Sequence, residues 1–341
     1  MSHNKPYLFN YLVLIGRFQG PHRGHMTVID RALKISEKLI IVLGSHNEPR
    51  SFRNIWNSQE RMEMIRSLYP NDLDRIEFVF QETYTYNNTK WTASIQAQVH
   101  NIVGREDAVI GLIGHAKDHS SYYLKMFPQW KSYNVDEKVR FDATMARVKL
   151  FETNQFDENI PPSVQQYIHK WWKENPDAVD YVKEEYAFLK EHDRLWEGSP
   201  YPPMFITVDA AVVQSGHILL IERDRMPGKG LWALPGGYLN RYEKIEDGVL
   251  RELREETRLK VPTPVLKGSI KEHRVFDDPY RSQRGRIVTH AFHFQLADDI
   301  KLPKVTGGDD ARKAFWVELG SLKRNNMFED HYDIIDELVN L

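Results

Sequence analysis

The sequence of 341 residues contains no cysteine. Disulfide bonds, thiolate metal sites and cysteine nucleophiles are therefore excluded, and the composition is compatible with a reducing cytoplasm. No apolar stretch approaches the roughly 18–20 residues that a transmembrane helix needs. The first apolar run, 11–15, is cut short by Arg17 and no signal-peptide cleavage site follows it. We expect a cytoplasmic protein that does not enter a membrane.

A strong excess of charge of one sign is also lacking. The 46 basic residues nearly balance the 48 acidic residues, and the net charge is −2. No overall attraction to nucleic acid or to an anionic membrane follows, so any anion-binding site must be made from locally grouped basic residues. Hydrophobic residues make up 41% of the chain. At this length, that suffices for the cores of two ordinary domains.

The first half of the chain alternates between short apolar runs and segments in which apolar residues have helical spacing. Four apolar runs are typical of buried strands: 11–15, 39–44, 76–80 and 108–113. Between them, helical spacing occurs at 24–37, 58–69 and 92–103. A strand–helix–strand repeat predicts an α/β domain over 1–160, with a doubly wound, Rossmann-like parallel sheet.

The second half has a different character. Residues 161–203 predict two helices, separated at Asn175-Pro176, followed by a linker. Beyond them, strands are expected at 205–213, 217–224, 287–296 and 314–318, and one acidic helix at 244–257. This mixture predicts a second, α+β domain over 204–341.

The motif GRFQGPHRGH, residues 16–25, connects the first expected strand to the first expected helix. Ligands bind at this edge of a parallel sheet. A helix N-terminus offers free N–H groups, and Gly24 lets the backbone approach a ligand closely. The imidazoles of His22 and His25 can donate hydrogen bonds to phosphate oxygens. The pattern favours a phosphate site, while a metal site and a turn with incidental histidines remain open on spacing alone.

This motif resembles the signature of the HxGH nucleotidyltransferases, and its Gly-Arg-Phe-Gln lead is similar to archaeal-type nicotinamide mononucleotide adenylyltransferases. Three later stretches match that family in order: 44–61, 84–91 and 141–147. Two departures occur, since Asp142 stands in the family's serine position and Gly20-Pro21 replaces a proline followed by an aromatic residue. The resemblance covers roughly residues 8–160.

The resemblance implies a reaction of ATP with nicotinamide mononucleotide that gives NAD and pyrophosphate. The mononucleotide phosphate would attack the α-phosphorus of ATP directly, so catalysis is mostly positioning and charge stabilisation. The implied catalytic residues are His22, His25 and Arg147. The residues implied to contact the substrates are Arg17, Phe18, Gly24, Arg53, Trp91, Gly114, His115 and Thr144, with Lys117 as a weaker candidate.

The segment 234–259 places three glutamates on one face of the expected acidic helix: Glu252, Glu255 and Glu256. Carboxylates crowded on one face repel each other unless a cation lies between them, and hard oxygen ligands select Mg²⁺ or Mn²⁺. Arg251 can brace Glu243 and orient the group. The alternative is a solvated acidic helix with ion pairs between successive turns.

The spacing from Gly237 through Glu243 to Arg251 and the glutamates resembles the Nudix box, with Arg258 where that family has glycine. The resemblance implies that Glu252, Glu255 and Glu256 bind the metal and take part in catalysis. Its supporting residues are Gly237, Glu243 and Arg251. We expect Mg²⁺ as the cofactor, with Mn²⁺ as a possible substitute.

The segment 275–292 resembles one found in ADP-ribose pyrophosphatases. It implies that Arg281, Arg284 and Arg286 meet a diphosphate or a terminal ribose. Asp310, or its neighbour Asp309, is expected either to help activate water or to cap its loop. The implied reaction is metal-assisted attack of water on ADP-ribose, giving AMP and ribose 5-phosphate.

The whole chain thus resembles the bacterial proteins that combine a nicotinamide mononucleotide adenylyltransferase with a Nudix hydrolase. Two alternatives remain for its function. The first domain could use another phosphate-bearing acceptor. The second could hydrolyse another nucleoside diphosphate compound or only sense ADP-ribose. No nucleic-acid partner is expected, and a homo-oligomer is left open.

Overall fold

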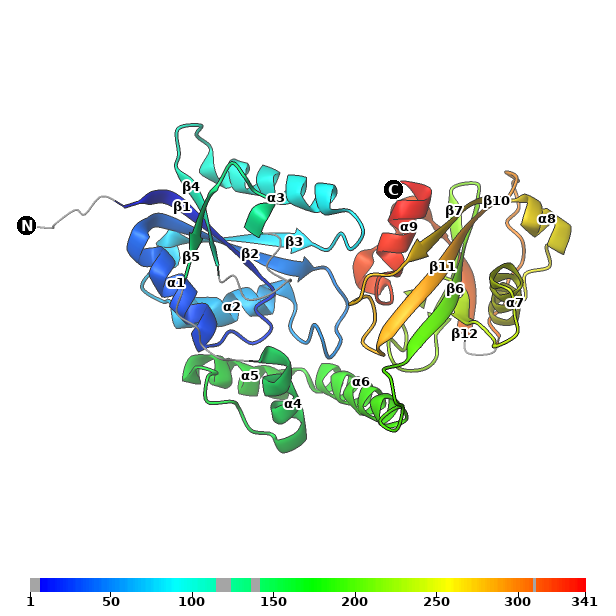
Figure 1. Cartoon of the computed structure of the whole chain (residues 1–341), viewed down its shortest axis with the longest axis horizontal. Helices are drawn as coiled ribbons and strands as arrows, with labels where there is room; N and C mark the ends of the chain where they lie inside the picture. Colours follow the sequence, from blue (N-terminus) through cyan, green and yellow to red (C-terminus); the bar gives the residue numbers. More distant parts are fainter. Residues whose placement is uncertain (1–6, 115–123, 136–141, 309–310) are drawn as a thin grey trace, which may run out of the picture. The chain divides into compact units, whose positions relative to one another are not determined.

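A computed structural model of the chain describes residues 7–114, 124–135, 142–308 and 311–341 (Figure 1). The chain divides into two compact units, Met1–Asp180 and Tyr181–Leu341, and each is described by itself. The division falls within helix α6, Pro176–Arg194, so the domain limits expected from the sequence stay a prediction. None of the described helices has both the length and the hydropathy that crossing a bilayer requires.

The first unit contains a five-stranded sheet in which all neighbouring strands run parallel. Its strands, in the spatial order β3-β2-β1-β4-β5, are β1 (Phe9–Gly16), β2 (Ser36–His46), β3 (Ile76–Glu82), β4 (Ile110–Gly114) and β5 (Lys131–Asn134). The predicted parallel sheet is confirmed, and its first four strands are those that the apolar runs indicate. The sequence does not predict β5, because this short segment is polar and mostly exposed.

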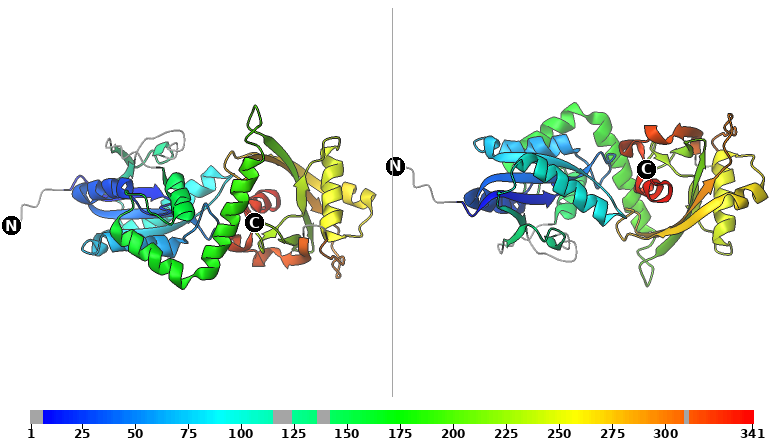
Figure 2. Two further views of the ribbon diagram at one scale, coloured as in Figure 1. Left: turned by 90° about the horizontal axis from the view of Figure 1, so that it is seen from below. Right: turned by 90° about the horizontal axis from the view of Figure 1, so that it is seen from above.

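Helices cover both faces of this sheet (Figure 2). They are α1 (Arg23–Ile35), α2 (Ser58–Leu68) and α3 (Asn88–Val103). On β1, Leu12 and Leu14 join the core shared with α1 and α2, whereas Val13 and Ile15 join the core shared with α3. The sheet is therefore doubly wound, as predicted. Helix α1 ends two residues earlier than predicted, because Ser36 already belongs to β2.

The strand order reverses between β1 and β4, which pair through Val13 and Leu112. In doubly wound sheets, ligands bind in the crevice outside the carboxyl ends of the strands at such a point. The chain leaves β1 at Gly16 and β4 at Gly114, so the predicted phosphate motif begins at this edge. Two further helices of this unit are α4 (Ala143–Thr153) and α5 (Pro162–Glu174).

The second unit contains a mixed sheet in which only β6 and β11, among the described strands, pair in parallel. Its strands are β6 (Met204–Gln214), β7 (His217–Arg223), β8 (Trp232–Ala233), β9 (Gly236–Tyr238), β10 (Ile270–Phe276), β11 (Arg286–Gln295) and β12 (Ala311–Glu318). The main path runs β10-β11-β6-β7-β12, with β8 beside β7 and β9 beside β6. The predicted α+β fold is confirmed.

Helices lie on both faces of the second sheet (Figure 2). They are α7 (Ile245–Thr257), α8 (Thr263–Gly268) and α9 (His331–Val339). Val249, Leu250 and Leu253 of α7 are buried in the core that includes the apolar residues of β6. Helix α7 also contacts β9, which brings its predicted metal-binding glutamates to the strand that carries Gly237.

Candidate active sites

At the end of β1 the chain turns sharply before α1. Phe18 has a left-handed backbone conformation with φ of 51°, and its buried ring stacks on His25 with 4.5 Å between centroids. A side chain at Gly16 would approach that ring to 2.9 Å, so any larger residue would have to displace the ring. Gly16 and Phe18, at the start of the motif, therefore help to position the ring of His25.

His22 and His25 lie together at the start of α1, with 3.7 Å between ring centroids. The backbone N–H of His22 donates to Nδ1 of His25 at 3.3 Å. The neutral ring of His25 must then carry its hydrogen on Nε2. A donor at Nε2 beside a helix N-terminus suits an anionic ligand.

Three arginines from separate segments form a group of like charge in this unit. Burial, and then the charge of Arg53, lowers the pKa of Arg17. Burial, and then the charges of Arg17 and Arg53, lowers the pKa of Arg147 to about 10. Among the described residues, neither Arg17 nor Arg147 has a carboxylate within ion-pair distance. Arg147 is buried, while Arg17 and Arg53 keep part of their surface exposed. Guanidinium groups that repel one another at close range form a site for a polyanion.

Arg61 positions the backbone around this group, and the sequence analysis missed it. Its side chain is completely buried and donates to the carbonyl oxygens of Arg17, Gly44 and Ser45, the last two at 2.7 and 3.2 Å. The carbonyl of Arg17 directly follows β1, and those of Gly44 and Ser45 lie near the end of β2. Burial, and then the charge of Arg17, lowers the pKa of Arg61 to about 10. Arg61 thereby adds a fourth cation to the group and, with Arg147, is one of its two buried members.

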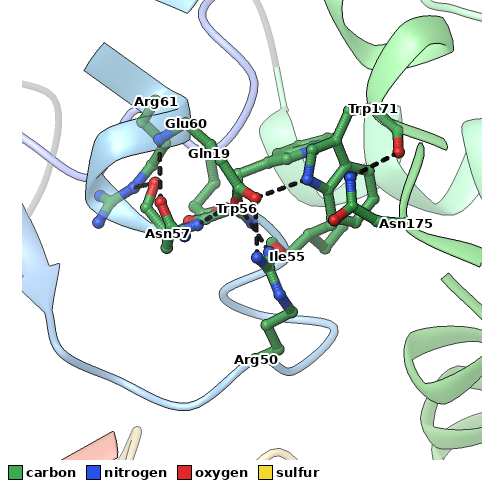
Figure 3. Close-up of polar contacts among 9 residues, drawn as sticks. All are labelled: Gln19, Arg50, Ile55, Trp56, Asn57, Glu60, Arg61, Trp171 and Asn175. Atoms are coloured by element: carbon green, nitrogen blue, oxygen red, sulfur yellow. Dashed lines mark hydrogen bonds and ion pairs between the residues drawn. The ribbon is translucent and has the colours of Figure 1, made fainter. Parts of the chain in front are cut away.

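The loop that carries Arg53 is tied to α2 and α5 by a polar network (Figure 3). Arg50 binds both carboxylate oxygens of Glu60 at 2.8 and 2.7 Å, and it also donates to the carbonyl of Ile55. Nε1 of Trp171 donates to the same carboxylate at 2.6 Å, and the guanidinium of Arg50 lies over the Trp171 ring. The network joins residues up to 111 positions apart, and we infer that it holds the loop in place.

Arg50→Met is expected to raise the KM values of the first site several-fold while kcat changes little. The loop loses its anchor, and Glu60 loses a charge-assisted pair of bonds worth about 1.5–3 kcal/mol. Steady-state kinetics and urea unfolding measure both effects. The matched control is Arg66→Met, which removes a half-exposed pair with Glu63 on α2. Equal effects of the two variants would contradict an anchoring role.

The remaining predicted residues of the first site have these positions. Asp142, in the serine position of the motif, caps α4 by accepting from the N–H groups of Thr144 and Met145. Thr144 accepts a hydrogen bond from Arg147 at 3.3 Å. Trp91 is partly buried against Phe127. Gly114 ends β4, while His115 and Lys117 lie outside the described residues.

In the second unit, β9 runs close to the glutamates of α7. A side chain at Gly237 would come within 2.7 Å of Oε1 of Glu252, so glycine is needed for this approach. The N–H of Gly236 donates to Glu256 at 2.8 Å. Strand and helix together thus hold two of the three predicted ligands.

Arg251 binds several carboxylates of the acidic segment. It binds Glu243 through two bonds of 2.7 and 2.9 Å, as expected from the sequence. Its Nη1 also donates to Glu252 and Glu255, each at 2.8 Å. Hydrogen bonds to these carboxylates, above all to Glu243, raise the pKa of Arg251. One guanidinium therefore orients three carboxylates.

Glu252 and Glu256 are buried, with 9% and 6% of each residue exposed. Burial raises the pKa of both carboxyl groups, that of Glu256 to about 8. Two adjacent buried carboxylates fit a hard divalent cation, which would hold them in the charged form. No ready-made group of three acidic or histidine ligands occurs among the described residues; Arg251 instead engages Glu252 and Glu255.

Helix α7 ends as the box glycine would end it, although the residue is arginine. Arg258 has φ of 51° and ψ of 28°, and its N–H donates to the carbonyl of Arg254 at 2.9 Å. This left-handed conformation costs a residue with a side chain about 1–2 kcal/mol. The departure from the box therefore leaves the geometry of the helix end intact.

A cavity of about 600 Å³ opens beside Glu256. Arg281 and Arg284 line it, but each is paired with an acid: Arg281 with Asp330 at 2.8 Å and Arg284 with Glu329 at 3.1 Å. Arg286 does not line the cavity and bonds to the carbonyl of Asp277. Asp309 and Asp310 lie outside the described residues.

Comparisons with known proteins find relatives of both units. A cytidylyltransferase-like family model matches residues 13–142, and a NUDIX domain model matches residues 204–338. A nicotinamide/nicotinic acid mononucleotide adenylyltransferase of Acinetobacter baylyi is 38% identical over 48% of this chain and 86% of its own. An ADP-ribose pyrophosphatase of Methanocaldococcus jannaschii is 33% identical over 39% of this chain and 71% of its own.

Solved structures of one bifunctional protein match nearly the whole chain. The bifunctional NMN adenylyltransferase/ADP ribose pyrophosphatase of Francisella tularensis, complexed with AMP and a manganese ion, is 33% identical, with a TM-score of 0.91. The match covers 97% of this chain and 99% of that one. The chain belongs to this bifunctional family. The prediction of a nucleotidyltransferase joined to a Nudix hydrolase is confirmed, and a divalent metal is a general feature of the Nudix half.

Within this bifunctional protein, the sequence analysis missed three cavity residues of the Nudix half. Asp209 is buried on β6 and accepts a hydrogen bond from Thr289. Arg223 is stacked 3.9 Å from the Phe328 ring and has no carboxylate within ion-pair distance among the described residues. His331 accepts from the N–H of Leu234 at 3.0 Å through Nδ1, so its neutral ring carries a hydrogen on Nε2. Nothing in their local sequence marks these residues.

His331→Asn is expected to make the Nudix half of the bifunctional protein less sensitive to acid. Burial lowers the pKa of His331 from 6.5 to about 4; the charged groups around it are Asp209, Arg223, Arg281 and Glu329. As the pH falls below 6.5, His331 becomes protonated in the unfolded chain but stays neutral in the folded chain. The free energy of unfolding therefore decreases, by about 2–3 kcal/mol near pH 4. Asparagine keeps an acceptor for the Leu234 N–H but does not titrate.

The measurement is urea unfolding at pH 7 and pH 4.5, with hydrogen exchange of α9 assigning the transition to the second unit. His217→Asn on β7 serves as the control, because Nδ1 of His217 lies 2.8 Å from the carbonyl of Ser215 in a partly exposed setting. If the His331 variant and the parent lost the same stability between these pH values, the proposed role of a buried neutral His331 would be wrong.

Proposed function

We propose that the first unit transfers the adenylyl group of ATP to nicotinamide mononucleotide, and that the second unit hydrolyses ADP-ribose to AMP and ribose 5-phosphate. The observation that carries the first activity is the group of arginines Arg17, Arg53 and Arg147, of which Arg147 is buried, in a unit whose α1 begins with His22 and His25. That arrangement suits a triphosphate far better than a neutral ligand.

In the first reaction, a phosphate oxygen of nicotinamide mononucleotide forms a bond to the α-phosphorus of ATP. The bond from that phosphorus to the oxygen bridging the β-phosphate breaks, and pyrophosphate leaves with the electron pair. Negative charge therefore grows on the leaving group, where the guanidinium groups of Arg17, Arg53 and Arg147 stabilise it. His22 and His25 donate hydrogen bonds to phosphate oxygens, and Trp91 stacks on the nicotinamide ring.

In the second reaction, Glu252 and Glu256 hold a divalent cation, which we propose to be Mg²⁺, and Glu255 joins them. When bound, the cation neutralises the diphosphate and makes water a stronger nucleophile. Arg251 keeps the carboxylates oriented, and Arg223 binds the diphosphate with a guanidinium that no described carboxylate neutralises. Water adds to one phosphorus, and the bond to the bridging oxygen breaks to release the two monophosphates.

The test is a steady-state assay of the full chain with ATP and three acceptors: nicotinamide mononucleotide, nicotinate mononucleotide and pantetheine phosphate. A higher kcat/KM for a pyridine mononucleotide is expected, and a preference for pantetheine phosphate would overturn the first proposal. The same preparation is tested on ADP-ribose and other nucleoside diphosphate compounds with Mg²⁺ or Mn²⁺. Binding of ADP-ribose without turnover would make the second unit a sensor.

A further inference from the structure

The cavity of the second unit is lined by two chemically different sets of side chains. One set is charged and includes Asp209, Arg223 and Glu256. The other is mostly aromatic and apolar: Phe188, His192, Leu195, Trp196, Phe205 and Tyr238. Because Phe205 and Asp209 lie at different positions along β6, we call the two sets the aromatic end and the charged end. A ligand that fills the whole cavity must therefore have an anionic part and a flat, weakly polar part.

The aromatic end is organised around one ring. Trp196, His192 and Tyr238 meet the ring of Phe205 at steep angles of 65–71°, with centroids 5.2–5.8 Å away. Such edge-to-face contacts hold the rings as walls rather than as a closed stack. Trp196 and Tyr238 remain 42% and 44% exposed. Large aromatic surfaces left open in a concave site are suited to contact a planar ligand.

Four of the six side chains at the aromatic end come from outside the segment that matches the NUDIX model, which begins at residue 204. Phe188 and His192 belong to α6, and Trp196 lies in the turn that follows. This part of the chain packs on the second unit, because His192 and Trp196 contact the ring of Phe205 on β6. The turn is closed by a hydrogen bond from the N–H of Trp196 to the carbonyl of Asp193 at 3.0 Å.

We propose that the end of α6 and its following turn complete a base-binding subsite of the hydrolase, in which a purine ring of a nucleoside diphosphate stacks on the exposed surface of Trp196, beside Phe205 and Tyr238. The diphosphate then extends toward Arg223 and Glu256. A sugar at the aromatic end would leave its hydroxyl groups without enough polar partners, whereas a purine offers two apolar faces. The inference rests on the proposed hydrolase activity and deepens it, because it assigns specificity to a segment that precedes the hydrolase domain.

The test uses three full-length variants. Trp196→Ala is expected to raise KM for ADP-ribose about tenfold, with kcat within about twofold of the parent, because stacking contributes to ground-state and transition-state binding alike. Trp196→Phe should restore most of the affinity. Tyr201→Ala removes a highly exposed aromatic ring of the same linker that does not line the cavity, and it should leave KM unchanged.

Product inhibition tests whether the purine base of the substrate binds at the aromatic end of the cavity. In Trp196→Ala the inhibition constant of AMP should rise about tenfold, while that of ribose 5-phosphate should stay the same. The opposite pattern would place the ribose at the aromatic end, and a fall in kcat with unchanged KM would make Trp196 a positioning residue; either result overturns the proposal. If the parent chain does not hydrolyse ADP-ribose, calorimetric binding of AMP to the parent and to Trp196→Ala tests the subsite separately from the activity.

Discussion

Replacing Arg147 with methionine is expected to lower kcat/KM for NAD synthesis about 100- to 1000-fold, while ADP-ribose hydrolysis by the same preparation is unchanged. The guanidinium is buried beside Arg17 and Arg53, where a charge acts on a developing phosphate charge with little screening by water. Steady-state kinetics of both reactions on one sample measure this. The unaffected hydrolysis reports that the second unit is intact.

A stability measurement separates charge stabilisation from a structural role of Arg147. Without nucleotide, the charges of Arg17 and Arg53 repel the buried guanidinium of Arg147, so Arg147→Met should unfold at an equal or higher urea concentration than the parent. Addition of ATP should stabilise the parent but not the variant. Lys149→Met, at an exposed position of α4, is the control and should behave like the parent. A variant that loses stability in the absence of nucleotide would indicate that Arg147 serves the fold instead.

Much of the architecture follows from local patterns. Buried parallel strands are continuous apolar runs, and the helices between them carry one apolar stripe, so their places are readable in the sequence. The Nudix glutamates are equally local, because helical spacing alone puts Glu252 and Glu256 side by side. The short strands β8 and β9 have no such pattern, since two or three residues are too few to show a period.

The rest of both sites depends on contacts between distant segments. In the sequence, Arg61 and Arg223 look like ordinary surface arginines. In the structure, Arg61 donates to backbone carbonyls and Arg223 lies over the ring of Phe328. Arg281, which is predicted to meet substrate, pairs with Asp330, 49 positions away, and its own segment does not reveal this partner. Sequence spacing identifies which charges exist, whereas tertiary pairing decides which of them remain available to a ligand.

Glu256→Gln is expected to lower ADP-ribose hydrolysis at least about 1000-fold, while NAD synthesis is unchanged. The amide oxygen can still accept the hydrogen bond from the Gly236 N–H, so the fold should persist, but a neutral amide is a far weaker ligand for a hard cation than a carboxylate. Glu255 is nearly half-exposed, with 46% of its side chain accessible. Glu255→Gln should therefore have a smaller effect than Glu256→Gln, although both are predicted ligands.

Metal binding provides a readout that does not depend on turnover. Mn²⁺ should raise the unfolding midpoint of the second unit in the parent and leave that of Glu256→Gln nearly unchanged. The control is Glu246→Gln, on the same helix as Glu256, which removes a surface pair with Lys267 of α8. This variant should keep both the metal response and the hydrolysis. If Glu256→Gln retained full hydrolysis with an unchanged Mn²⁺ response, the cation would have to be held elsewhere. The burial and raised pKa of Glu256 would then reflect only its packing against β9.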